Sequence, residues 1–89
     1  MTRAVLAEFR TLRLRHLKYG IGKIGDIERY RNLQRDVQEF ILSLPSESQR
    51  LVMEAMYIHG RSASSAALML YYSESQVRRI RRMVLDGLE

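Results

Sequence analysis

The segment that most constrains this chain is 61–82, which has two short helical patterns on either side of a break at Tyr71-Tyr72-Ser73. Apolar residues recur where two helices that cross at a steep angle bury them. These positions are Ala66, Ala67, Leu70, Tyr72, Val77 and Ile80. Ser62 and Ser73 each precede a helical run, where a side-chain oxygen can accept a hydrogen bond from a free backbone N–H. The segment predicts a helix-turn-helix, with Ala67 where its helices come closest.

The last helix is predicted over about Glu74 to Gly87. Its inward positions are Val77, Ile80, Val84 and Leu88, and its outward positions are Ser75, Arg78, Arg79 and Arg82. Arg81 lies at the apolar edge, where the stem of an arginine packs and its guanidinium reaches water. An outward row of guanidiniums suits the major groove of DNA, which admits one helix, and arginine donates two hydrogen bonds to guanine. Glu74 either accepts from a cytosine amino group or complements the helix dipole.

Composition sets broad limits on the chain. With 89 residues it forms one domain. The net charge of +5 and the pI of about 10.1 favour polyanionic partners. There is no cysteine, so neither a disulfide nor a thiolate zinc site is predicted. The two histidines, His16 and His59, lie on different predicted helices and give no metal-ligand set.

The first predicted helix, over about Thr2 to Tyr19, is amphipathic and strongly basic. Its apolar face carries Val5, Leu6, Phe9, Leu12, His16, Leu17 and Tyr19, with Leu14 on the opposite side. Its basic residues are Arg3, Arg10, Arg13, Arg15 and Lys18. They contact a phosphate backbone or form a solvated face, and the sequence leaves both open. Because arginines interrupt its apolar residues, the segment is neither a signal peptide nor a membrane span, which predicts a soluble protein with no membrane partner.

Residues 20–25 match the pattern G-x-G-x-x-G of dinucleotide-binding sites. That site needs a strand before the glycines and a βαβ unit around them. Here a helix precedes them and no strand pattern follows. Three glycines in six residues disfavour a stable helix, so the segment is predicted to be a hinge between helices, and no cofactor is predicted.

The second long helix is predicted from an N-cap at Asp26 to about Ser43. Its apolar stripe comprises Ile27, Tyr30, Leu33, Val37, Phe40, Ile41 and Leu44. The steps of three and four resemble a coiled-coil seam, but they span only about two heptads. Packing within the chain is the first interpretation of this stripe, and self-association is the alternative.

The next helix is predicted from Ser46 to a left-handed C-cap at Gly60. Pro45 suits the turn before this helix, and Ser46 with Gln49 has the form of a capping box. No nucleophile and base are placed together by spacing, and no carboxylate pair lies on an apolar face. The chain is therefore predicted not to be an enzyme.

Three runs in the second half carry a resemblance to a known family. They are 44–52 (LPSESQRLV), 57–62 (YIHGRS) and 66–79 (AALMLYYSESQVRR). They resemble the fourth region of bacterial sigma factors and, still more, the small phage transcriptional regulators of the RinA and ArpU type. The resemblance implies sequence-specific binding of double-stranded DNA. By position, it implies DNA contacts from Ser73, Glu74, Ser75, Arg78, Arg79 and Arg82.

Two features depart from that family. The family usually has glycine at the turn position that Tyr71 occupies, where the backbone tends toward positive φ. A tyrosine kept in that conformation costs on the order of 1 kcal/mol, so the turn either bears this cost or is reshaped. The run from Ser62 to Ala67 also lacks the acidic residues usual in the first motif helix.

Taken together, the sequence predicts an all-α protein of about five helices. Residues 1–44 form a helical arm that braces or dimerises, and residues 45–89 form the DNA-binding unit. The predicted function is that of a phage transcriptional regulator, a homodimer in the bacterial host cytoplasm. The alternatives are an adaptor that binds RNA polymerase or another phage protein, and the DNA-recognition subunit of a packaging terminase.

Overall fold

The computed structural model describes the backbone of residues 1–19 and 24–88, and the side chains of residues 1–15 and 27–88. Within these ranges the chain is helical and contains no strand. The elements are α1 (Arg3–Tyr19), α2 (Ile24–Leu42), α3 (Glu47–Met53), the π-helical η1 (Glu54–Ile58), α4 (Ala63–Leu70) and α5 (Glu74–Asp86). Because η1 continues α3 directly, the predicted all-α architecture of about five helices is confirmed.

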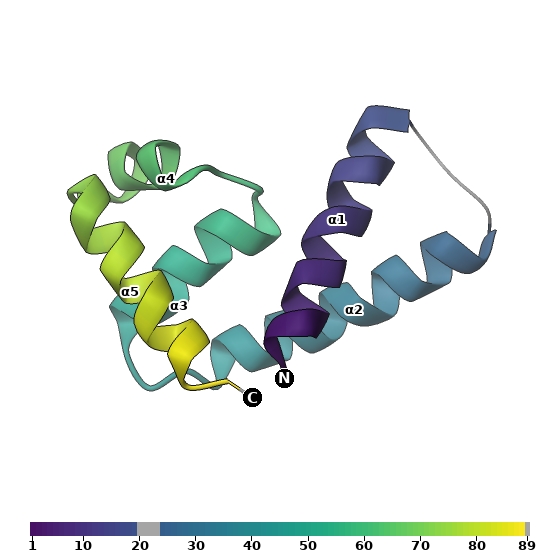
Figure 1. Ribbon diagram of the computed structural model, residues 1–89, viewed down its shortest axis with the longest axis horizontal. Coiled ribbons are helices and arrows are strands. Elements are labelled where there is room, and N and C mark those ends of the chain that lie inside the picture. The colour runs from purple at the N-terminus through teal and green to yellow at the C-terminus, as the bar shows by residue number, and fades with distance from the viewer. Residues whose placement is uncertain (20–23, 89) are drawn as a thin grey trace.

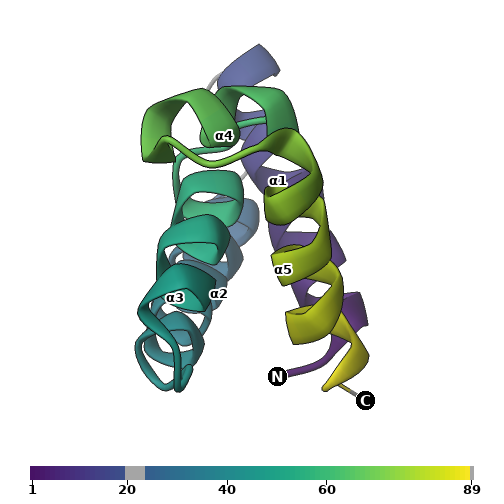
Figure 2. The same cartoon turned by 90° about the vertical axis from the view of Figure 1, so that its left-hand side faces the viewer.

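The helices form two groups that share one body. Figure 1 shows α3, α4 and α5 at one end and the pair α1 and α2 at the other. In the view of Figure 2, α1 and α5 lie along one side of the molecule, and α2 and α3 lie along the other. The two ends of the chain consequently lie near each other, at the same end of α1 and α5.

A single apolar core joins the two groups. Leu6 and Phe9 of α1 are 1% and 0% exposed. They belong to the same buried cluster as residues from α2, α3, η1, α4 and α5: Leu33, Val37, Ile41, Val52, Met53, Ala55, Met56, Tyr57, Ala66, Ala67, Val77, Ile80 and Val84. The core therefore continues across the predicted boundary at residue 44.

The apolar stripe of α2 is used mainly inside the chain. Leu33, Val37 and Ile41 are buried, and Tyr30 stacks on Phe9 with ring centroids 5.5 Å apart. The packing interpretation of this stripe therefore holds for its central residues. These three buried residues are not accessible to a second copy of the chain.

One predicted helix start is wrong, and one predicted cap contact is absent although its helix starts where expected. The helix α2 begins at Ile24, so Asp26 lies inside it rather than at its N-cap, and the predicted hinge falls mostly on residues 20–23, outside the described residues. Ser46 is the N-cap residue of α3 but accepts no cap hydrogen bond, and its hydroxyl lies 2.8 Å from the hydroxyl of Ser48. The capping box with Gln49 is thus not formed.

Gly60 ends the third helix as predicted, with a φ of 65°. The N–H of Arg61 donates to the Ala55 carbonyl at 3.0 Å and closes the turn. A Cβ at Gly60 would overlap the guanidinium of Arg13, whose Nε donates to the Ile58 carbonyl at 3.0 Å. Glycine is therefore favoured twice here, by its backbone conformation and by the arginine packed against it.

Polar contacts also fasten α1 to the other helices. Arg29 of α2 donates to both carboxylate oxygens of Glu8, at 2.7 and 2.8 Å. The hydrogen bond from Arg29 lowers the pKa of Glu8, and the charge of Arg29 adds to the effect. This pair therefore stabilises the fold above the ordinary pKa of glutamate, and the contribution is lost as pH falls through the lowered value. At the far end, Arg3 donates to the Leu85 carbonyl at 2.9 Å and to Asp86 at 2.6 Å.

The turn at Tyr71 keeps the left-handed conformation. Its φ and ψ are 59° and 36°, and its side chain is 96% exposed. The N–H groups of Tyr71 and Tyr72 both donate to the Ala67 carbonyl, which satisfies an end group of α4 that lacks a helical partner. The turn is therefore not reshaped, and the tyrosine bears the steric cost.

We predict that Tyr71→Gly stabilises the protein by about 1 kcal/mol, because glycine adopts positive φ without a Cβ clash. Urea unfolding followed by circular dichroism measures this change. Tyr71→Ala is the matched control, since it removes the ring but keeps the Cβ, and it should give no gain. An equal gain from both variants would show that the exposed ring, and not the backbone conformation, causes the cost.

Candidate nucleic-acid interface

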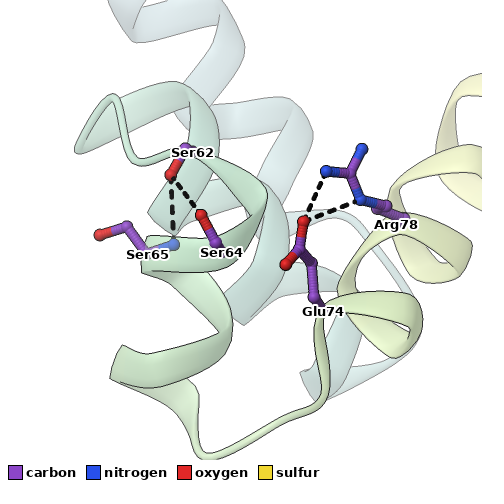
Figure 3. A network of polar contacts seen from close by, with 5 residues as sticks. All are labelled: Ser62, Ser64, Ser65, Glu74 and Arg78. Atoms are coloured by element: carbon purple, nitrogen blue, oxygen red, sulfur yellow. Dashed lines mark hydrogen bonds and ion pairs between the residues drawn. The ribbon is translucent and has the colours of Figure 1, made fainter.

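Serine caps set the starts of both motif helices. Ser62 accepts a hydrogen bond from the Ser65 N–H at 3.2 Å, and Ser73 accepts one from the Gln76 N–H at 3.1 Å. Figure 3 shows the Ser62 hydroxyl beside the Ser65 nitrogen. Both predicted N-caps are confirmed, which fixes where α5 begins and which of its residues face outward.

The inward face of α5 agrees with the predicted pattern. Val77, Ile80 and Val84 are 0%, 7% and 6% exposed. On α4, Ala66 and Ala67 are buried, and the small side chains allow the two helices to pack closely. This packing sets the rotation of α5 and so places its arginines on the surface.

All six residues predicted to contact DNA lie on the surface of one short stretch. They are Ser73, Glu74, Ser75, Arg78, Arg79 and Arg82, and each is exposed. The Ser73 hydroxyl accepts the cap hydrogen bond, whereas the Ser75 hydroxyl, in the first turn of α5, makes no hydrogen bond with the residues that the structure describes. The structure therefore brings the six predicted residues together on one surface, and one of them, Ser73, also caps α5.

Glu74 and Arg78 form an ion pair along α5. The Arg78 Nη2 and Nε donate to Glu74 Oε1 at 2.5 and 3.2 Å, as Figure 3 shows. The side chains are 65% and 46% exposed, for Arg78 and Glu74, so the pair is worth only a few tenths of a kcal/mol. The sequence analysis did not predict this ion pair, although residues four apart on a helix are neighbours and Glu74 and Arg78 have that spacing. A ligand that takes Arg78 must compete with Glu74.

Two arginines of the outward face have no such partner. Within the part of the chain that the structure describes, Arg79 and Arg82 make no hydrogen bond or ion pair. Their guanidiniums are exposed and their charge is not offset locally. They are therefore the side chains of α5 best able to take an anionic ligand.

Arg81 is half-buried at the edge of the apolar face, as predicted. Its Nε donates to the Tyr57 hydroxyl at 3.3 Å, and its guanidinium carbon lies 5.9 Å from the centre of the Tyr57 ring. A guanidinium near an aromatic face is attracted by the ring electrons. The contact with Tyr57 was not predicted, because 24 residues separate the two side chains and only the packed fold places them together.

Basic side chains also line the surface between α5 and α1. One shallow hollow is lined by Arg3, Arg78, Arg81, Arg82, Leu85 and Asp86. A neighbouring hollow is lined by Arg3, Ala7, Arg10, Thr11, Leu14, Tyr57, Arg81 and Leu85. The two hollows share three residues and so form one continuous surface.

Other kinds of site find little support in the described residues. No group of three metal-ligating side chains occurs among them, and the Nε2 of His59, just after the end of η1, lies 3.6 Å from a carboxylate oxygen of Glu54. None of the described helices is both long and apolar enough to cross a membrane. The side chain of His16 lies outside the described residues.

Comparisons of the chain with protein-family models, with curated proteins and with solved structures give no match.

We predict that Ser73→Ala lowers the free energy of unfolding by about 1 kcal/mol, because it removes the acceptor for a free N–H of α5. Denaturant unfolding measures the loss. Ser75→Ala, also exposed in the first turn but without a cap role, should change stability by less than about 0.5 kcal/mol. Equal losses from both variants would contradict the cap assignment.

Proposed function

We propose that this protein binds double-stranded DNA in a sequence-specific manner, with α5 in the major groove. The observation that carries the proposal is the exposed row of Ser75, Arg78, Arg79 and Arg82 on the second helix of a helix-turn-helix. The groove is about 12 Å wide and accepts one helix, and an arginine donates two hydrogen bonds to guanine. The turn at Tyr71 and the cap at Ser73 support it by fixing where that row points.

The residues of the row have different roles in this proposal. Arg78 reads a base edge, exchanging the carboxylate of Glu74 for guanine oxygen and nitrogen. Arg79 and Arg82, which lack partners among the described side chains, contact phosphates. The weak ion pair with Glu74 holds the Arg78 side chain in place before binding and costs little to break.

The resemblance to phage regulators of the RinA and ArpU type supports a more specific role. On that basis the protein is a phage transcriptional regulator that acts in the bacterial host cytoplasm and encounters RNA polymerase on the DNA. A recognition subunit of a packaging terminase uses the same DNA contacts. Chromatin immunoprecipitation during infection separates them: promoter-proximal sites fit the regulator, and a single packaging site fits the terminase subunit.

For Arg79→Ala we predict a smaller salt dependence of DNA binding. The plot of log binding constant against log salt should lose about one unit of slope, because one phosphate contact and its released counterion are removed. Fluorescence anisotropy at several salt concentrations measures the slope. Arg31→Ala is the control: it removes the same charge from an exposed position on α2, which lies away from α5. A slope unchanged in Arg79→Ala, or lowered equally in both variants, would contradict the phosphate role.

Arg78→Ala tests base reading separately. We expect a loss of about 1–3 kcal/mol on the preferred duplex and relaxed preference at one base pair. Selection of bound sequences from a random pool measures the preference of the parent and the variant. An unchanged preference would remove Arg78 from the reading role.

The expected form on DNA is a homodimer, because two half-sites offset the limited contact of one small module. Sedimentation at high micromolar protein, with and without a selected duplex, measures the assembly. A monomer in both conditions would contradict this prediction.

A protein-interaction adaptor is the second candidate, and one observation favours it. Leu68 and Tyr71 are 82% and 96% exposed near the end of α4, which is unusual for large apolar side chains so close together. A partner such as RNA polymerase would cover them. The absence of binding to any duplex in a genomic selection would favour this candidate over DNA recognition.

A further inference from the structure

The structure divides the arginines of α1 into two groups. Arg3 and Arg13 donate to carbonyl groups of α5 and η1, at Leu85 and Ile58, and so hold α1 in place. Arg10 is exposed and makes no hydrogen bond or ion pair within the described residues. Its side chain lines the hollow between α1 and α5 together with Arg3 and Arg81. Arg10 is therefore directed toward α5 without being used by the fold.

Charge is unevenly distributed around the molecule. The two adjoining hollows beside α5 are lined by five arginines, Arg3, Arg10, Arg78, Arg81 and Arg82, and by one acidic residue, Asp86, which Arg3 already engages. A hollow beside α2 has the opposite character, with Asp36 and Glu39 and no basic residue in its lining. Five arginines therefore gather along the side shared by α1 and α5, which Figure 2 shows together.

The rotation of α5 relates this surface to the proposed groove contacts. At about 100° per residue, Arg81 and Leu85 lie on the flank of α5 between its buried face and the outward row. Arg3 of α1 reaches that flank and bonds the Leu85 carbonyl. With the outward row in the major groove, this flank faces one edge of the groove, where a phosphate backbone runs. The α1 surface thus lies beside the DNA backbone when α5 is bound.

The guanidinium of Arg81 is preorganised for a phosphate contact. The hydroxyl and ring of Tyr57 orient its guanidinium at the junction of the two hollows. An arginine ordered in advance loses less side-chain entropy on binding an anion. Arg10 and Arg82 flank it on α1 and α5 respectively, and neither is neutralised by a described neighbour.

We propose that Arg10, Arg81 and Arg82 form a phosphate-binding surface across α1 and α5, which grips the DNA backbone beside the groove occupied by α5. The proposal rests on the proposed function, because its ligand is the same duplex. It makes α1 part of the DNA interface, in addition to its part in the core. These contacts carry no base information, so they strengthen binding to every sequence alike.

Arg10→Ala tests this surface, with Arg15→Ala as the matched control. Both residues are exposed on α1, both lack a partner in the described part of the chain, and each substitution lowers the net charge by one. Arg15 is absent from the lining of both hollows. Arg10→Ala should reduce the slope of log binding constant against log salt by about 0.9. It should weaken binding to the selected duplex and to an unrelated duplex by the same factor. Arg15→Ala should leave the slope near that of the parent protein.

Equal salt slopes in Arg10→Ala and the parent protein would overturn the proposal. Equal losses of slope in Arg10→Ala and Arg15→Ala would also overturn it, because they would indicate only the effect of net charge. A change in base preference in Arg10→Ala would also overturn it, because phosphate contacts do not read sequence. Thermal unfolding of both variants verifies that the fold is retained. If the parent protein binds no duplex, the proposed function itself fails, whereas parent binding with an unaffected Arg10→Ala variant removes this surface alone.

Discussion

Burial of the α1 side chains Leu6 and Phe9 in the same core as α3, α4 and α5 is the constraint on which the rest of the structure depends. A chain of 89 residues cannot build two cores of useful size, so each helix contributes its apolar face to one. Full burial of a side chain such as Phe9 contributes about 2–3 kcal/mol. The consequence is that α1 is fixed relative to α5, and the arginines of both helices keep a defined spacing.

Local patterns predicted much of this architecture. The starts at Ser62 and Ser73, the left-handed Gly60 and the buried side of α5 each depend on residues within a few positions of one another. The contacts that could not be predicted join distant segments: Arg81 with Tyr57, and Arg3 with Leu85 and Asp86. Their formation depends on how the helices pack, which periodicity does not determine. The capping box at Ser46 is a local exception, because the predicted contact is not formed although α3 begins directly after Ser46.

The structure also sorts arginines that look equivalent in the sequence. Some serve the fold, as Arg13 does at the Ile58 carbonyl, and one is held by a carboxylate, as Arg78 is by Glu74. Three of those without a partner among the described residues, Arg10, Arg79 and Arg82, are proposed to contact phosphate, together with Arg81, which Tyr57 orients. Net charge alone does not make this distinction, because it counts every guanidinium equally.

The most direct test of the proposed DNA interface is a nuclear magnetic resonance titration of the labelled protein with a duplex obtained by selection. With α5 in the major groove, the backbone amide signals of residues 74–82 should shift most. The signal of Arg10 should shift with them, and those of exposed residues within 28–39 of α2 should remain unchanged. Shifts centred on Leu68 and Tyr71 or on α2, with α5 unaffected, would contradict the placement of α5 in the groove.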